Sequence, residues 1–251
     1  MTMRPIAAIA AILAAACGTE DAPDPLEPDG PTGRVRFVNV ITDTTRGRVN
    51  AILEGVPFGV NLTYTLSTPA TLPAPSTAPY APILAGNRTL VLRRTADTTA
   101  LVATLPFTVD AGQDRTVYAV GGRNNTAITA FVTTDVNTAP AAGQARVRVV
   151  NLSPTASAVD VFVTAPNADL ATATPAASGL AVQGASTHAA VAAGTYRVRV
   201  VPAGTPASGR AAAVFIDVTG VALPNGGVRT VVLADNNVGG APMRAFVLSD
   251  N

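Results

Sequence analysis

An internal repeat constrains this chain more than any other feature. Residues 33–42 read GRVRFVNVIT, and residues 145–154 read ARVRVVNLSP. Three later matches keep nearly the same spacing: Ala85-Gly86 with Ala193-Gly194, Arg115-Thr-Val117 with Arg229-Thr-Val231, and Ala130-Phe-Val132 with Ala245-Phe-Val247. A match that keeps its spacing over ~100 residues indicates duplication of a whole domain.

Each copy reads as a series of short strands. Polar and apolar residues alternate in Arg34–Ile41, as in a half-buried strand. Gly, Asp and Asn separate the apolar stretches, and no stretch after the first 16 residues has a helical period. The predicted strands are 34–41, 48–53, 61–66, 88–94, 101–109, 115–120 and 127–133, then 146–152, 158–163, 195–201, 211–218, 228–233 and 243–248. The Pro-rich stretches 67–82 and 165–185 are predicted to be loops.

This pattern predicts an all-β protein with two tandem antiparallel Ig-like β-sandwich domains. The expected bounds are 34–136 for the first domain, 137–144 for a linker, and 145–251 for the second. Hydrophobic residues make up 48% of the 251 residues and aromatic residues only 4%. The cores must therefore be built from Val, Ala, Leu and Ile, which suits strands.

The first 16 residues read as a signal peptide. Arg4 precedes the apolar run Ile6–Ala16, which is too short to span a bilayer core of ~30 Å. The segment LAAACG at residues 13–18 resembles a bacterial lipoprotein signal. The resemblance implies that cleavage falls before Cys17 and that Cys17, the only cysteine, is lipidated. Gly18 rather than Asp follows, which implies an outer-membrane destination in a Gram-negative cell. The alternative is an ordinary secreted protein.

Residues 17–33 are predicted to be a disordered tether that follows the lipidated cysteine. They contain five acidic residues, four prolines and no basic residue, so they cannot form a core. Beyond them the chain has 16 Arg against 11 Asp and Glu, a formal charge of 16 − 11 = +5. The whole chain is nearly balanced at +1, which gives no support to nucleic-acid binding.

The second copy resembles the bacterial family called domain of unknown function 4397. The motifs that carry the resemblance are Ser153-Pro154, the strand VDVF at residues 159–162 and the hairpin AGTY at residues 193–196. The resemblance spans most of residues 33–250 and is strongest in the second copy. It implies envelope-associated β-domains with no assigned activity, and it supplies no catalytic residue.

Four arginines and one aspartate form the candidate ligand face. Arg146 and Arg148, and likewise Arg197 and Arg199, are spaced by two and so share one side of a strand. If both strands lie in one sheet, the four guanidinium groups form a row, and Asp160 can pair with one of them. Such a row could bind carboxylate, sulfate or phosphate groups of a polymer. The alternative is a solvated strand face that prevents edge aggregation.

No catalytic, cofactor-binding or metal-ligating set stands out. His188 has no second histidine to support it, and we expect a surface or turn position. Glu54 is the only glutamate after the tether, so a pair of catalytic carboxylates has little basis. Asp235-Asn236-Asn237 and Asp250-Asn251 could offer oxygens to Ca²⁺, but turn-forming roles explain them equally.

We therefore expect a non-catalytic lipoprotein of the cell envelope with a structural or adhesive role. Its lipid anchor would hold it to the outer membrane, on the periplasmic or the exposed side, where it would contact envelope proteins or acidic polymers. The alternative is a ligand-binding or sensing accessory protein that uses the Arg face or the cleft between the domains.

Overall fold

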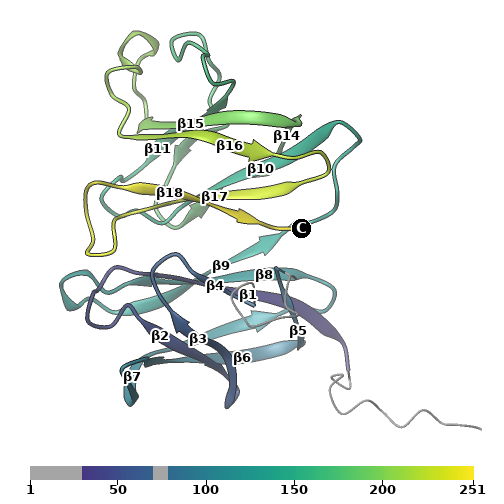
Figure 1. Cartoon of the computed structure of the whole chain (residues 1–251), viewed down its shortest axis with the longest axis vertical. Helices are drawn as coiled ribbons and strands as arrows, with labels where there is room; N and C mark the ends of the chain where they lie inside the picture. The colour runs from purple at the N-terminus through teal and green to yellow at the C-terminus, as the bar shows by residue number, and fades with distance from the viewer. Residues whose placement is uncertain (1–29, 70–78) are drawn as a thin grey trace, which may run out of the picture.

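The computed structural model describes residues 30–69 and 79–251 as two stacked β-sandwiches (Figure 1). The predicted signal peptide, Cys17 and most of the predicted tether lie outside the described residues. Within the described part, the only helical elements are two short 3-10 turns, Arg123–Asn125 and Ala207–Gly209. No helical segment there has the length and hydropathy needed to cross a bilayer.

The first sandwich contains nine strands and the second contains nine more. The first nine are β1 (Thr32–Ile41), β2 (Val49–Leu53), β3 (Val56–Leu62), β4 (Ser67–Thr68), β5 (Ala81–Leu84), β6 (Gly86–Arg94), β7 (Asp97–Val109), β8 (Asp114–Gly121) and β9 (Ile128–Asp135). The second nine are β10 (Gln144–Asn151), β11 (Val159–Thr164), β12 (Ala177–Leu180), β13 (Gly184–Ala185), β14 (Ala189–Ala192), β15 (Gly194–Pro202), β16 (Ile216–Leu223), β17 (Val228–Ala234) and β18 (Arg244–Ser249).

The two sandwiches share one topology, as a duplication requires. In the first, one sheet has the order β4-β1-β8-β9, with β5 also on β1, and the other has the order β3-β2-β6-β7. In the second, the matching sheets are β13-β10-β17-β18, with β14 on β10, and β12-β11-β15-β16. The sheets that contain β1 and β10 face each other, and we call them the inner sheets (Figure 1). The other two are the outer sheets.

The expected antiparallel sandwiches are confirmed, and one pair of strands in each inner sheet is parallel. β1 runs parallel to β8, and β10 runs parallel to β17. A parallel pair needs a long crossover connection. Here the intervening strands supply it: the chain leaves β1, builds β2 and β3 of the outer sheet, adds β4 and β5 beside β1, builds β6 and β7 of the outer sheet, and returns as β8.

Most predicted strands are present, but several bounds were wrong. The third strand spans Val56–Leu62, whereas residues 63–66 of the predicted strand 61–66 form a turn. The strand predicted over 211–218 begins only at Ile216, because the 3-10 turn and its continuation occupy the residues before it. The last residues of the predicted tether and of the predicted linker belong to strands, since β1 begins at Thr32 and β10 at Gln144.

The predicted loops also contain short strands. Residues 67–82 include β4 and the start of β5, and residues 165–185 include β12 and β13. β14 was missed altogether. All five are two to four residues long, which is too short for a periodic pattern to show.

Both inner sheets are buried on two faces rather than one. In β1, Val35, Phe37 and Ile41 enter the core of the first sandwich. The alternate residues Val38 and Val40 enter a separate cluster shared with the second sandwich. A strand covered on both faces is apolar in both phases, as FVNVI at residues 37–41 is. The half-buried strand predicted from alternation was therefore wrong for this segment.

A buried asparagine occupies the same position near the end of β1 and of β10 and makes equivalent hydrogen bonds in the two sandwiches. Asn39 is fully buried, and its Nδ2 donates to the carbonyls of Gly47 and Leu62, at 2.7 and 2.9 Å. The Nδ2 of Asn151 donates in the same way to Ser157 and Leu180, at 2.7 and 3.1 Å. This shared role explains why the repeated motif keeps the asparagine.

We predict that Asn151→Ala lowers the free energy of unfolding by about 3 kcal/mol, because two buried carbonyls lose their donor. Chemical denaturation measures the change. The control is Asn87→Ala at an exposed position, where we expect a change within about 0.5 kcal/mol. Equal effects of the two substitutions would contradict a structural role for Asn151.

Candidate functional site

The arginines predicted to form one row lie in two different sheets. Arg146 and Arg148 belong to β10 of the inner sheet, whereas Arg197 and Arg199 belong to β15 of the outer sheet. The two sheets lie on opposite sides of the sandwich core, so the four guanidinium groups do not form a row. The condition on which the row depended, that both strands share a sheet, is not met.

Asp160 and the β15 arginines have local structural partners. Asp160 is buried, and its carboxylate accepts hydrogen bonds from the amides of Gly179 and Gly204, at 2.7 and 3.1 Å. The predicted pairing of Asp160 with one of the four arginines was therefore wrong. Arg197 forms a two-pronged ion pair with Asp217 across to β16, at 2.5 and 2.7 Å. Arg199 donates to a side chain and a carbonyl of the same sandwich.

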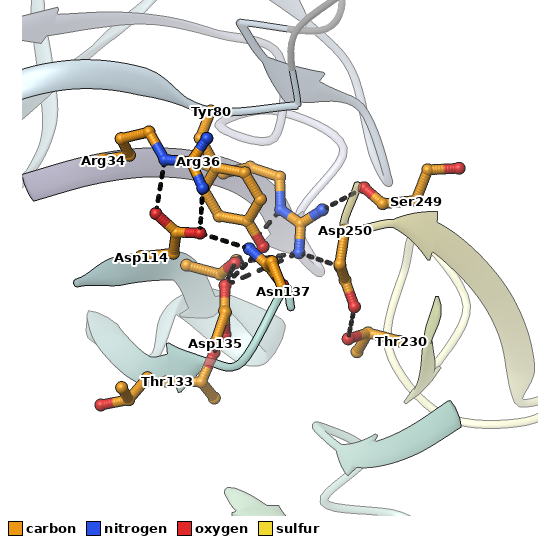
Figure 2. A network of polar contacts seen from close by, with 12 residues as sticks. Arg34, Arg36, Tyr80, Asp114, Thr133, Asp135, Asn137, Thr230, Ser249 and Asp250 are labelled. Carbon is orange, nitrogen blue, oxygen red and sulfur yellow. Dashed lines mark hydrogen bonds and ion pairs between the residues drawn. The ribbon is translucent and has the colours of Figure 1, made fainter. Parts of the chain in front are cut away.

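A buried polar network joins the two sandwiches, and Arg36 forms one half of it (Figure 2). Its side chain is 2% exposed. Nε and Nη2 donate to Thr116 of the neighbouring strand, at 3.1 and 3.0 Å. Across the interface, Nη2 donates to the Asp250 carboxylate at 2.7 Å, and Nη1 donates to the Ser249 carbonyl at 2.8 Å. Arg36 of the first sandwich is therefore neutralised by a carboxylate of the second.

Arg148 forms the other half in the reverse direction. Its Nε donates to Thr230 at 2.8 Å, as Arg36 does to Thr116. It then reaches into the first sandwich, where it pairs with the Asp135 carboxylate and donates to the Thr134 carbonyl at 3.0 Å. Equivalent residues thus exchange partners across the interface. This is the arrangement of a twofold-symmetric dimer, realised here within one chain.

An apolar cluster surrounds this network. Val38, Val40 and Tyr118 of the first inner sheet meet Val150 and Val232 of the second, all nearly or fully inaccessible to solvent. Two isolated sandwiches would expose this surface to water. Burial of it stabilises the face-to-face arrangement, and the crossed ion pairs fix the relative position of the sheets.

The charges of the network favour the ionised form of the Asp135 carboxyl group, whereas burial keeps the Tyr80 hydroxyl protonated. Burial alone would raise the pKa of Asp135, but Arg148 and Arg36, with hydrogen bonds from Thr116 and Tyr80, outweigh it and lower that pKa below its ordinary value. Burial raises the pKa of Tyr80 well above its usual range, so this hydroxyl stays protonated and donates to Asp135 at 2.6 Å.

Beside the network lies a cleft of about 670 Å³ between β9 and the strands β10, β13 and β14. Arg146, Arg148 and His188 line it from the second sandwich, and Thr133 and Thr134 line it from the first. His188 is half-buried rather than on the free surface, and it directly precedes β14. Burial, and the nearby Arg148, lower its pKa, so the imidazole is neutral at pH 7.

The aspartates considered for calcium have internal donors. Asp235 accepts hydrogen bonds from Ser153 and Thr155, and from the Gly240 amide at 2.7 Å. The Asp250 carboxylate accepts hydrogen bonds from Arg36 and from Thr230. In residues 30–69 and 79–251, no three His, Cys, Asp or Glu side chains gather as metal ligands would.

Sequence reasoning missed Arg36, Asp135, Asp250 and Tyr80 as parts of one site. A signal for three of them was present, because Arg36 and Arg148 are equivalent positions of the repeat, as are Asp135 and Asp250. The repeat alone does not show that the arginine of each copy pairs with the aspartate of the other copy. Tyr80 had no such signal, since the matching position in the second copy is His188.

Residues 33–162, about half of the chain, match the family described as "Domain of unknown function (DUF4397)". The chain belongs to this family. The expected resemblance is therefore confirmed, and the matched residues cover the first sandwich and the second as far as β11, whereas the strongest part had been expected in the second copy. The first copy is therefore a DUF4397 domain in its own right, and no function comes with that description.

Solved structures that match the chain superpose poorly. One is a leucine-rich repeat protein from Bacteroides thetaiotaomicron VPI-5482, with 13% identity, a TM-score of 0.19, and coverage of 86% of this chain and 26% of that one. Another is a candidate cell adhesion protein from Bacteroides fragilis NCTC 9343, with 11% identity, a TM-score of 0.23, and coverage of 98% and 92%. Our chain spans about a quarter of the first. No curated protein sequence matches.

We predict that Arg148→Met lowers the free energy of unfolding by about 3–5 kcal/mol, because it leaves the Asp135 carboxylate buried without its closest cation. Chemical denaturation measures the loss. The matched control is Arg197→Met, which breaks a more exposed ion pair that solvent screens and should change stability far less. A similar small effect at Arg148 would mean that the network does not hold the sandwiches together.

The lowered pKa of Asp135 predicts how stability depends on pH. An aspartate whose folded pKa lies below its unfolded value of about 3.9 contributes stability above that value. The contribution is lost as the pH falls through the folded pKa. We expect the stability difference between the wild type and Asp135→Asn to narrow as the pH decreases from about 5 to 2. Denaturation curves across this range test it, and parallel pH profiles would contradict it.

Proposed function

We propose that this chain is a non-catalytic lipoprotein of the cell envelope, and that its two joined sandwiches act as a structural or adhesive interaction module. The crossed network of Arg36, Asp135, Arg148 and Asp250 carries the proposal. It joins the two domains face to face through ion pairs and buried apolar side chains. Two joined domains behind the acidic, proline-rich segment would suit a role in spacing or contact at a membrane surface.

The membrane part of the proposal rests on the sequence. The Cys17 lipid would anchor the chain to the outer membrane, and the proline-rich tether would hold the sandwiches away from the lipid. Acyl chains contribute about 0.8 kcal/mol per buried methylene, and more than one chain gives a stable anchor. Partners would then be envelope proteins or acidic polymers.

A non-catalytic role is supported by how the ionisable groups are used. The buried carboxylates of Asp135, Asp160, Asp235 and Asp250 each accept hydrogen bonds from several internal donors. Groups bound in this way stabilise the fold and are poorly placed to exchange protons with a substrate. The arginines of the network are likewise paired.

The second candidate function is that of a ligand-binding or sensing accessory protein. The cleft between β9 and β10 favours it, because a volume of about 670 Å³ lies within the range typical of small-molecule sites. Arg146 in this cleft belongs to the originally expected ligand face, although Arg197 and Arg199 do not reach it.

We predict that Cys17→Ser moves the protein from the membrane fraction to the soluble fraction of native cells, since no other cysteine can carry the lipid. Fractionation and immunoblotting measure this.

In the same cells, cross-linking followed by mass spectrometry should find the wild type attached to a few recurrent envelope partners. These cross-links should disappear with the anchor.

The control is Arg197→Gln, a surface change in the outer sheet that leaves Cys17 intact and should not alter fractionation. A Cys17→Ser variant that stays in the membrane fraction would overturn the lipoprotein proposal. Absence of any enriched partner for the anchored wild type would reject an adhesive role. Hydrolytic activity that persists through rigorous purification would reject both proposed functions.

A further inference from the structure

The duplication lets each residue of the second sandwich be compared with its counterpart in the first. β1 pairs with β8 so that Arg34 lies opposite Asp114, and the two side chains form a two-pronged ion pair at 2.7 and 2.5 Å. β10 pairs with β17 in the same register, so that Arg146 lies opposite Val228. The second sandwich thus keeps the arginine and replaces its carboxylate partner with an apolar side chain.

A second exchange occurs on the opposite edge of the same strands. In the first sandwich, Val35 pairs with Ala81, which places Tyr80 beside Arg36 with its ring 4.6 Å from the guanidinium carbon. In the second, Val147 pairs with Ala189, which places His188 at the matching position. Tyr80 is buried and its hydroxyl donates to Asp135. The Nε2 of His188 has no hydrogen-bond partner in the described part of the chain.

The second exchange places His188 in the wall of the cleft, and the first leaves Arg146 of that wall without a carboxylate opposite it. Arg146 and His188 both line the cleft. Arg148 also lines it, but Thr230, Thr134 and Asp135 occupy its donors. Within residues 30–69 and 79–251, the Arg146 side chain makes one hydrogen bond, from Nη1 to the Thr138 carbonyl at 3.2 Å. Among the described residues, no carboxylate lies within ion-pair distance of it, so its Nε and Nη2 donors remain available for a ligand.

We propose that this cleft is a binding site for an organic carboxylate, which Arg146 holds as Arg34 holds Asp114. The exchange of Tyr80 for His188 changes one wall of this cleft, and the exchange of Asp114 for Val228 leaves Arg146 without an ion-pair partner among the described residues. The proposal rests on the second candidate function, that of a ligand-binding protein, and is independent of the lipid anchor and of a structural role.

The chemistry of the cleft defines the ligand class. A planar guanidinium matches a carboxylate with two parallel hydrogen bonds, and the neighbouring imidazole of His188 can donate one more. Thr133, Ser186 and Thr187 also line the cleft, although the hydroxyls of Thr133 and Ser186 donate to Asp135 and to the Thr187 carbonyl. The volume of about 670 Å³ admits one or two sugar rings or a short peptide end.

The test uses the purified full chain and isothermal titration calorimetry. Glucuronate and N-acetyl-dialanine present the same carboxylate on a sugar and on a peptide end. Glucose and the amidated peptide are their uncharged counterparts, and inorganic phosphate is the competing anion. We expect saturable binding of a carboxylate probe and no binding of the uncharged pair. Which of the two probes binds more tightly identifies the source of the carboxylate.

Variants locate the binding in the cleft. Arg146→Gln should weaken the binding by about tenfold or more, because it removes a charge-assisted contact. His188→Tyr should block binding, because the larger ring would fill part of the cleft, as Tyr80 fills the matching position of the first sandwich. The matched control is Arg197→Gln in the outer sheet, which should bind the probe as the wild type does. Thermal unfolding of each variant confirms that it is folded.

Two results would overturn the proposal. One is the absence of saturable binding of either carboxylate probe to the folded wild type. The other is binding that Arg146→Gln leaves unchanged or that phosphate or glucose shares equally. If His188→Tyr does not fold, Arg146→Gln alone decides, since its side chain is half-exposed at the cleft wall.

Discussion

The structure depends on two arginines that cross from one sandwich to the other. Arg36 and Arg148 are buried, and each finds its carboxylate in the partner domain. Arg36 also lies 3.9 Å from Asp135 of its own sandwich, and an isolated sandwich would expose its inner sheet to water. Within the stacked pair, loss of one of the cross-domain carboxylates would leave a buried guanidinium without its closest anion, which is strongly destabilising. The crossed ion pairs therefore stabilise the face-to-face arrangement of the two similar domains.

Duplication gave the interface its symmetry, and divergence removed part of it. The exchanges of Asp114 for Val228 and of Tyr80 for His188 lie at strand ends, at the first residue of β8 and β17 and just before β5 and β14. They leave the crossed ion pairs intact, so the second copy could change there without loss of the interface. In the first copy Arg34 pairs with Asp114 beside a cleft of about 710 Å³, whereas in the second copy Arg146 lines a cleft of about 670 Å³ and pairs with no carboxylate of the described residues.

Much of the fold could be predicted from the sequence, because strand and turn patterns are local. The repeat indicated two domains, and the longer strands fall near their predicted positions. The short strands β4, β5 and β12–β14 could not be found, since two to four residues carry no periodic signal. The candidate face failed for a different reason. Spacing by two places Arg146 beside Arg148 and Arg197 beside Arg199, but it does not say which sheet either strand joins.

The sequence by itself determined the β class, the duplication, and a composition with one histidine and one cysteine. These properties depend on composition and on local order along the chain. Only the tertiary structure decided that Arg36 and Arg148 are buried and that Arg146 is not paired. Burial and pairing depend on which distant strand covers a residue. Here, residues more than 200 positions apart, such as Arg36 and Asp250, meet because two inner sheets stack.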